Sequence, residues 1–156
     1  IIALVEGGET VAGWLYDPLA DRMCHAVRGG GAFINDEIVL ARESGEALPI
    51  AAISTLYIHE PRRAALAAAI DGKFAMVDIP RCAAEQYPRL VLGQNDVTLF
   101  ERTLPWDHAA GVLFTLEAGG HAARLDGSPY RPGDQRRGML AAASPAMWDK
   151  AAAIII

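Results

Sequence analysis

The sequence lacks most of the features that mark secreted, membrane-spanning or nucleic-acid-binding proteins. Its 156 residues include only two cysteines, too few for a disulfide framework and without the spacing of a zinc site. No apolar run approaches the roughly 18 residues that cross a bilayer, and no basic leader opens the chain. Lys and Arg form no cluster and the net charge is -5, so neither nucleic acid nor an anionic membrane is expected as a partner. Together these absences predict a cytoplasmic protein.

What the chain does have is enough apolar matter for a core. Hydrophobic residues make up 52% of it, which excludes disorder as the main state. Its length fits one domain, or one domain with part of another. The chain has no initiator methionine and begins with Ile1–Val5, which is typical of the interior of a strand. We therefore expect an upstream part of the protein.

The first half of the chain has the turns and the alternation of an antiparallel meander. Gly7-Gly8 suits a tight hairpin turn, and the Asp and Pro residues of Asp17–Asp21 predict the next turn. In the strand that follows, Cys24 and Ala26 share one face. Short strands are expected at Ile1–Val5, Thr10–Tyr16, Met23–Arg28 and Ala32–Ile34.

The second half alternates strands with helices, which indicates an α/β layer arrangement. Pro88 is expected to kink or divide its helix. The change of pattern falls in an exposed loop near 42–49, so we predict a β-meander over residues 1–45 and an α/β domain over 46–156. Strands are expected at Pro49–Ser54, Phe74–Ile79, Val97–Glu101 and Met139–Ala143, and helices at Glu60–Ile70, Ala83–Leu92, Trp106–Ala118 and from Ala146 onward.

The helix expected at Trp106–Ala118 begins with an acid. Asp107 falls in its first turn, where the macrodipole and the free N–H groups favour an ionised carboxylate. Such a carboxylate is a good ligand for a hard cation such as Mg²⁺. The small residues Ala109–Gly111 would let another group approach this turn closely. The alternative is that Asp107 only caps the helix.

This segment resembles the C-terminal signature of the inositol monophosphatase family. Trp106–Gly111 fits the family pattern W-D-x-A-[AG]-G, and Glu117–Gly120 fits the E-A-G-G that closes the helix. The resemblance runs the whole length of this chain but covers only the later part of the family's chain. Further matches lie at Val11–Pro18, Ala26–Asn35, Asp126–Tyr130 and Gly138–Ser144.

The resemblance implies a fold and an activity. The fold is a layered α/β sandwich of the sugar-phosphatase type, with the meander belonging to its N-terminal sheet. The activity is Mg²⁺-dependent, lithium-sensitive hydrolysis of a phosphorylated polyol, in which a metal-activated water attacks the phosphate in line and no phosphoenzyme forms. The family also implies a homodimer. Among substrates, inositol and sugar phosphates come first; fructose-1,6-bisphosphate, adenosine 3′,5′-bisphosphate and histidinol phosphate are alternatives.

By this resemblance, two acids serve the site. Asp107 is a metal ligand and also contacts a substrate hydroxyl. Glu101 matches the acid that binds a hydroxyl of the sugar or inositol ring, and a carboxylate suits that role because it accepts hydrogen bonds from O–H groups. Without the family, Glu101 could instead be a solvated loop charge paired with Arg102.

In the family, a segment with two small residues lies against the substrate, and this chain matches that segment in part. Ala83 and Ala84 match the last two residues of its G-[ST]-A-A segment, but Arg81 and Cys82 replace the first two. A guanidinium beside the site would favour a second phosphate or a carboxylate on the substrate. The alternative is that Arg81 points into solvent.

The family's other metal carboxylates have no match in this chain. They belong to a Glu-Glu helix and to a D-P-[IL]-D-G-T motif, both upstream in the family. Asp17–Asp21 looks similar, but Ala20 stands where the second carboxylate must be, so we interpret the segment as a turn. We therefore expect the chain alone to be inactive. The alternative function is a non-catalytic module that binds a sugar phosphate or a partner.

The remaining polar candidates are weaker. His25, His59, His108 and His121 show no metal-ligand spacing, and each is expected to be structural or exposed. Cys24 and Cys82 are expected to be small buried apolar residues. No nucleophile elbow is present, which argues against a covalent hydrolase.

Overall fold

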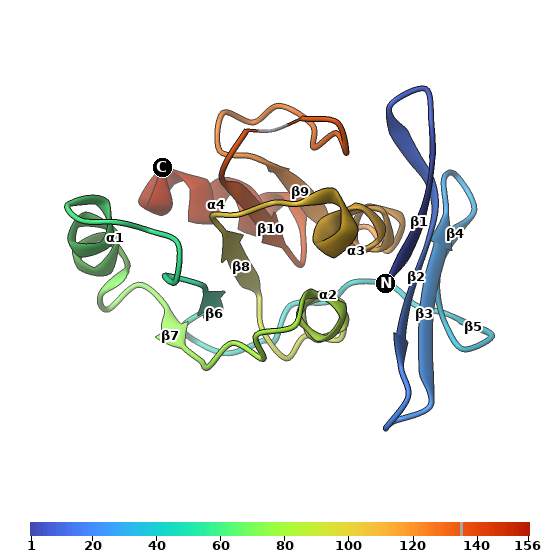
Figure 1. Ribbon diagram of the computed structural model, residues 1–156. Helices are drawn as coiled ribbons and strands as arrows, with labels where there is room; N and C mark the ends of the chain where they lie inside the picture. Colours follow the sequence, from blue (N-terminus) through green and yellow to red (C-terminus); the bar gives the residue numbers. More distant parts are fainter. Residues whose placement is uncertain (135) are drawn as a thin grey trace.

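Two five-stranded sheets flank a pair of helices in the computed structural model, which describes residues 1–134 and 136–156 (Figure 1). The first sheet is antiparallel and pairs its strands in chain order: β1 (Ile2–Glu6), β2 (Glu9–Asp17), β3 (Arg22–Val27), β4 (Gly31–Ile34) and β5 (Glu37–Ile38). The second sheet has the order β7-β6-β8-β10-β9, from β6 (Ile50–Ile53), β7 (Ala75–Met76), β8 (Val97–Phe100), β9 (His121–Arg124) and β10 (Met139–Ala142).

The helices complete a layered arrangement. Figure 1 shows α2 (Ala83–Val91) and α3 (Pro105–Glu117) between the two sheets, and α1 (Arg62–Ile70) and α4 (Pro145–Ile155) beyond the second sheet. One apolar core joins the first sheet to α2 and α3, and another joins the second sheet to α1 and α4. The predicted α/β class, with a meander followed by alternating elements, is confirmed. None of the described helices is both long and apolar enough to cross a membrane.

The predicted boundary between 1–45 and 46–156 falls between the two sheets. The first core, however, contains residues from both spans, because α2 and α3 pack against the first sheet. The division into two domains therefore stays a prediction.

Turns of the first sheet form where the sequence predicts them. Gly7 and Gly8 have φ of 58° and 81°, the positive values of a tight hairpin turn. The Asp17 carboxylate accepts hydrogen bonds from the backbone N–H groups of Leu19 (3.0 Å) and Ala20 (3.3 Å). The segment that looks like a metal motif is therefore a turn held by its own aspartate.

Several element predictions need correction. Strands β5 and β9 were not expected; β9 reads His-Ala-Ala-Arg, with no β-branched residue, and forms because it pairs along β10. Strand β7 is only Ala75–Met76, shorter than the predicted Phe74–Ile79. Helix α2 is one helix, so a division at Pro88 is wrong. Pro88 removes only the hydrogen bond that an N–H at its position would donate to the Ala84 carbonyl, and the bond from Leu92 N to the Pro88 carbonyl (2.8 Å) is kept at the helix end.

The second sheet is aligned by a buried acid, Asp96, directly before β8. Its carboxylate accepts hydrogen bonds from Ser44 N and Oγ (2.6 Å each) and from Ile50 N (2.7 Å). β6 runs parallel to β8 with Ile53 opposite Leu99. Because the ends of parallel strands meet at one edge of a sheet, the segments that follow β6 and β8 leave it side by side.

The small residues at the start of α3 admit other parts of the same chain. A Cβ on Gly111 would lie 2.0 Å from Cδ2 of Tyr87 on α2, and one on Gly13 of β2 would lie 2.7 Å from the Ala110 Cα. The close approach that Ala109–Gly111 predicts is therefore made here by α2 and β2.

Glu117, the last residue of α3, attaches that helix to the first sheet. Its Oε1 accepts a hydrogen bond from Gly29 N (2.9 Å) and its Oε2 accepts one from Gly31 N (3.0 Å). Both glycines have positive φ, so the turn that exposes these N–H groups requires them. The acid of the E-A-G-G segment therefore holds the β3–β4 turn.

The face of the first sheet that points away from α3 is apolar and uncovered by any described element. Ile2 lies opposite Trp14 in the β1–β2 pair, and Leu4 lies opposite Ala12. Ile2, Leu4 and Val27 are 67%, 57% and 52% exposed. Apolar surface of this kind favours association.

Substituting Gly111 tests the packing of α2 against α3. We expect Gly111→Ala to lower the free energy of unfolding by about 1–3 kcal/mol, because the new methyl group overlaps the Tyr87 ring. Gly133→Ala is the matched control, since nothing lies within 4 Å of its added Cβ. Urea unfolding measures both, and equal midpoints would contradict this account.

Association through the outer face is tested with charges. We expect the chain to self-associate in light scattering, and we expect Leu4→Lys with Val27→Lys to shift it toward the monomer. Leu19→Lys is the control, because Leu19 is 98% exposed and lies in the turn between β2 and β3 rather than on a strand of this face. A monomer at high concentration before any substitution would count against the prediction.

Candidate functional site

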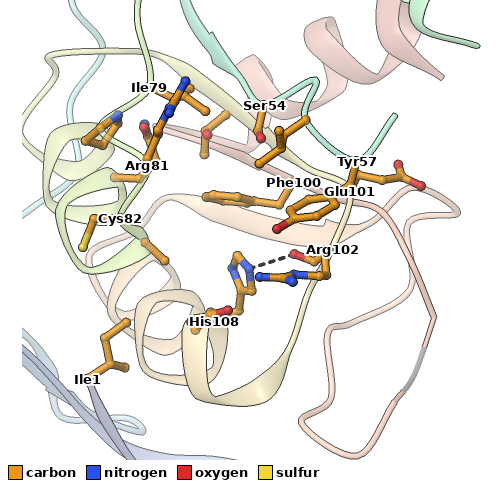
Figure 2. A pocket seen from close by; sticks show the side chains of 16 residues that line it. Ile1, Ser54, Tyr57, Ile79, Arg81, Cys82, Phe100, Glu101, Arg102 and His108 are labelled. Carbon is orange, nitrogen blue, oxygen red and sulfur yellow. Dashed lines mark hydrogen bonds between the residues drawn. The ribbon is translucent and has the colours of Figure 1, made fainter. Parts of the chain in front are cut away.

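A cavity of about 360 Å³ lies where the segments after β6 and β8 meet the first turns of α2 and α3 (Figure 2). All four residues predicted for the site, Arg81, Ala83, Glu101 and Asp107, line it. They are up to 26 positions apart in sequence, so the fold brings the predicted set to one place.

Asp107 lies in the first turn of α3 and is partly buried. The N-cap position belongs to Leu104, which has no side-chain cap, and Pro105 opens the helix. Among the described residues, none forms a hydrogen bond or ion pair with the Asp107 carboxylate. The alternative of a mere helix cap is therefore not what the structure shows; the carboxylate is available at the positive end of a helix.

Glu101 follows β8 directly and is only 7% exposed. Its Oε2 lies 3.4 Å from Nη1 of Arg62, and no described group donates a hydrogen bond to it. In Figure 2 its carboxylate points away from Phe100 and His108, so Glu101 lines the rim of the cavity.

The alternative of a solvated Glu101 paired with Arg102 is wrong. The acid is buried, and its ion-pair partner is Arg62. The Arg102 guanidinium instead lies over the Tyr57 ring, 4.4 Å from its centroid. Successive side chains at the end of a strand point in different directions, so Glu101 and Arg102 do not pair although they are adjacent in the sequence.

His108 is a buried histidine with both ring nitrogens engaged. Its Nε2 donates to the Arg102 carbonyl (3.0 Å), so its Nδ1 accepts the hydrogen bond from the Tyr87 hydroxyl (2.8 Å). Burial lowers the pKa of His108 to about 4, which keeps the ring neutral. The structural role predicted for this histidine is confirmed, and it fixes the start of α3 to the preceding linker.

Arg81 and Cys82 lie just before Ala83, the first residue of α2. Arg81 has φ of 56°, an uncommon left-handed conformation for a residue with a side chain. It is exposed and is also one of the residues that line the cavity. Cys24 is buried as predicted, and burial raises the pKa of its thiol to about 11. Cys82 is exposed, so its predicted burial is wrong: it precedes the helix at the edge of the cavity.

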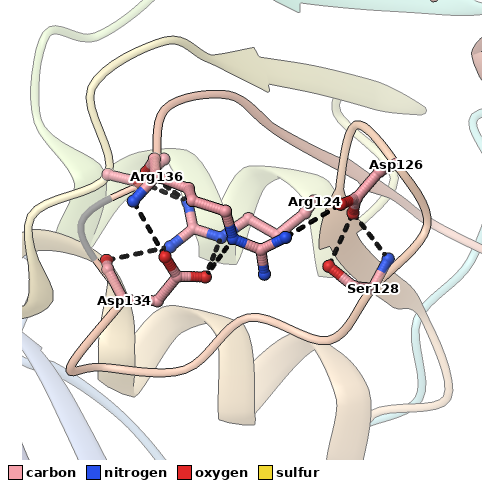
Figure 3. A network of polar contacts seen from close by, with 6 residues as sticks. Arg124, Asp126, Ser128, Asp134 and Arg136 are labelled. Atoms are coloured by element: carbon pink, nitrogen blue, oxygen red, sulfur yellow. Dashed lines mark hydrogen bonds and ion pairs between the residues drawn. The ribbon is translucent and has the colours of Figure 1, made fainter.

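Arg124, which is 1% exposed, contacts the linker from β8 to α3, and Figure 3 shows the polar network around it. Its Nη1 donates to Thr103 Oγ1 and to the Arg136 carbonyl, and its Nη2 donates to the Asp134 carbonyl. Its guanidinium also lies 4.7 Å from the centroid of the Tyr130 ring. This network fixes the backbone between Glu101 and Asp107, and no sequence motif indicated it.

Several residues of the cavity wall were not expected from the sequence. Tyr57 belongs to the segment after β6, Gln86 to α2, and Phe100 to the end of β8. They reach the cavity through the parallel pairing of β6 with β8 and the packing of α2, and no local spacing signals either.

The cavity does not contain a complete set of metal ligands. Within residues 1–134 and 136–156, no three His, Cys, Asp or Glu side chains lie close enough together to hold a metal ion. Asp107 can offer one charged oxygen, whereas Mg²⁺ takes six ligands and usually keeps several waters.

Comparison with known proteins agrees with these features. The model of the inositol monophosphatase family matches residues 1–156. An inositol-1-monophosphatase of Bacillus subtilis is 29% identical over 138 residues, covering 83% of this chain and 50% of that protein. One of Rhizobium meliloti is 32% identical over 138 residues, covering 81% and 49%.

The fold agrees as well. The structure of an inositol monophosphatase from Zymomonas mobilis matches with a TM-score of 0.85 at 21% identity, covering 98% of this chain and 60% of that one. The chain spans about half the length of the two relatives. Because the family model matches from the first residue to the last, the chain belongs to the inositol monophosphatase family.

Proposed function

We propose that this chain is the C-terminal part of a phosphomonoesterase that hydrolyses an inositol or sugar phosphate in the cytoplasm. The observation that carries the proposal is that Arg81, Ala83, Glu101 and Asp107 line one cavity, with the Asp107 carboxylate unpaired among the described residues. The relatives named as inositol-1-monophosphatases support the same reaction class.

Each residue has a proposed role that follows from its chemistry. Asp107 accepts a hydrogen bond from a substrate hydroxyl and offers an oxygen to a cation. Glu101, at the rim, accepts from a ring hydroxyl. Ala83 leaves space beside α2, where the substrate lies. Arg81 favours a substrate with a second anionic group, such as a bisphosphate.

The family resemblance implies Mg²⁺, together with inhibition by lithium. Bound Mg²⁺ supplies positive charge to the phosphate and its leaving oxygen. Asp107 is the ligand that this chain would contribute. Since the described residues do not form a complete ligand set, we propose that the other ligands lie upstream of Ile1 in the complete protein.

A non-catalytic sugar-phosphate-binding module is the second candidate, and the incomplete ligand set favours it. The residues encoded upstream of Ile1 separate the two. A D-P-[IL]-D-G-T motif there supports the phosphatase, and a complete protein without that motif supports the module.

The chain alone should show little phosphatase activity, because one available carboxylate does not build a metal centre. We expect turnover of inositol 1-phosphate with Mg²⁺ to stay well below about 1 s⁻¹, the lower end of ordinary enzymes. Phosphate release measures it. Turnover at or above that rate would show that the described residues suffice.

Asp107→Asn in the complete protein tests the ligand role. Asn removes the charge that a hard cation needs, so we expect kcat to fall by roughly 100-fold or more. The melting temperature without metal should barely change, since the carboxylate holds no described partner and a lost cap would cost only about 1 kcal/mol.

The measurement is kcat as a function of Mg²⁺ concentration. Asp149→Asn is the matched control, because Asp149 is exposed on α4 and does not line the cavity. An Asp107→Asn curve that coincides with that of the control would refute the ligand assignment.

A further inference from the structure

Gln86 lines the cavity and carries a buried polar atom without a described partner. The residue is 3% exposed and lines the cavity from α2. Its Oε1 is buried, and no described group donates a hydrogen bond to it. A buried acceptor without a donor is costly, so such a group calls for a specific explanation.

The orientation of the Gln86 amide is set by its neighbours. Asn95 Nδ2 donates to the carbonyl of Val97 (3.1 Å), which can only accept, so Asn95 Oδ1 faces Gln86. Gln86 Nε2 must then be the donor to Asn95 Oδ1 (3.0 Å). Asn95 is itself 1% exposed, so this pair is shielded from water. Oε1 is therefore the atom of the amide that remains free to accept.

The position of Gln86 fits a role in recognition. It lies three residues after Ala83, so both side chains occupy the same face of α2. Ala83 is small, which leaves space on that face of the cavity. Glu101, the acid expected to bind a ring hydroxyl, is turned toward Arg62 at the rim. The Gln86 amide lines the same cavity from α2, and its Oε1 is, besides Glu101 Oε2, an acceptor to which no described group donates.

We propose that Gln86 is a specificity residue whose Oε1 accepts a hydrogen bond from a hydroxyl group on the ring of the bound phosphate ester. This proposal rests on the proposed function for the identity of the ligand class. The hydrogen bond satisfies an acceptor that the free protein leaves unpaired, so the site favours a ring with a donor over one without.

The test compares two ligands and two variants in the complete protein. Inositol 1-phosphate carries ring hydroxyls, and cyclohexyl phosphate has a ring of the same size without them. Gln86→Leu removes the acceptor. Asn95→Leu is the matched control, because it breaks the same Gln86–Asn95 hydrogen bond but keeps the Gln86 carbonyl. Calorimetry gives Kd, and steady-state kinetics gives KM and kcat.

We expect Gln86→Leu to weaken inositol 1-phosphate about 10-fold in Kd and KM, as for the loss of one buried hydrogen bond. Cyclohexyl phosphate should change by less than about 2-fold, and kcat should stay close to the original value because the lost contact is made equally in the ground and transition states. Asn95→Leu should leave the preference between the two ligands intact.

Equal losses for both ligands, no loss for either, or the same selective loss in Asn95→Leu would overturn the role of Gln86. If Gln86→Leu does not fold, the double variant Gln86→Leu with Asn95→Leu removes both amides, and the same 10-fold selective loss is expected. Selective binding without turnover would support Gln86 and refute the phosphatase. Turnover without the selective loss would support the phosphatase and refute the role of Gln86. If neither ligand binds, both proposals are refuted.

Discussion

The parallel pairing of β6 with β8 is the interaction on which the site depends. It brings the segments after Ile53 and after Leu99 to one edge of the sheet, although they are 46 positions apart. Asp96 fixes this pairing at its other end through the backbone of Ile50 and the side chain and backbone of Ser44. Tyr57 and Glu101 line one cavity only because these two strands are aligned.

Residues of the W-D segment have a packing role in the structure. Gly111 leaves room for the Tyr87 ring, and the Tyr87 hydroxyl in turn donates to His108. His108 then donates to the Arg102 carbonyl in the linker before α3. Asp107 thus lies next to a residue, His108, that buried hydrogen bonds join both to α2 and to the linker before α3.

The features that could be predicted from the sequence are those that a few neighbouring residues determine. The glycine pair at 7–8, the aspartate turn at 17–21 and the proline at the start of α3 each determine backbone conformation without help from distant residues. The position of Asp107 follows from the same signals. Burial of Glu101, its pairing with Arg62 and the amide chain from Gln86 to Val97 all depend on contacts between distant segments, which no spacing reveals. The exposure of Cys82 could not be predicted either, because a single sequence does not show which side of a helix start faces a cavity.

Helix α3 connects the cavity to the β3–β4 turn of the first sheet. Asp107 stands at its beginning, and Glu117 at its end holds the Gly29 and Gly31 backbone of the first sheet. The 13 residues of the helix span roughly 20 Å at the usual rise per residue. One continuous helix therefore sets the distance between the β3–β4 turn and Asp107.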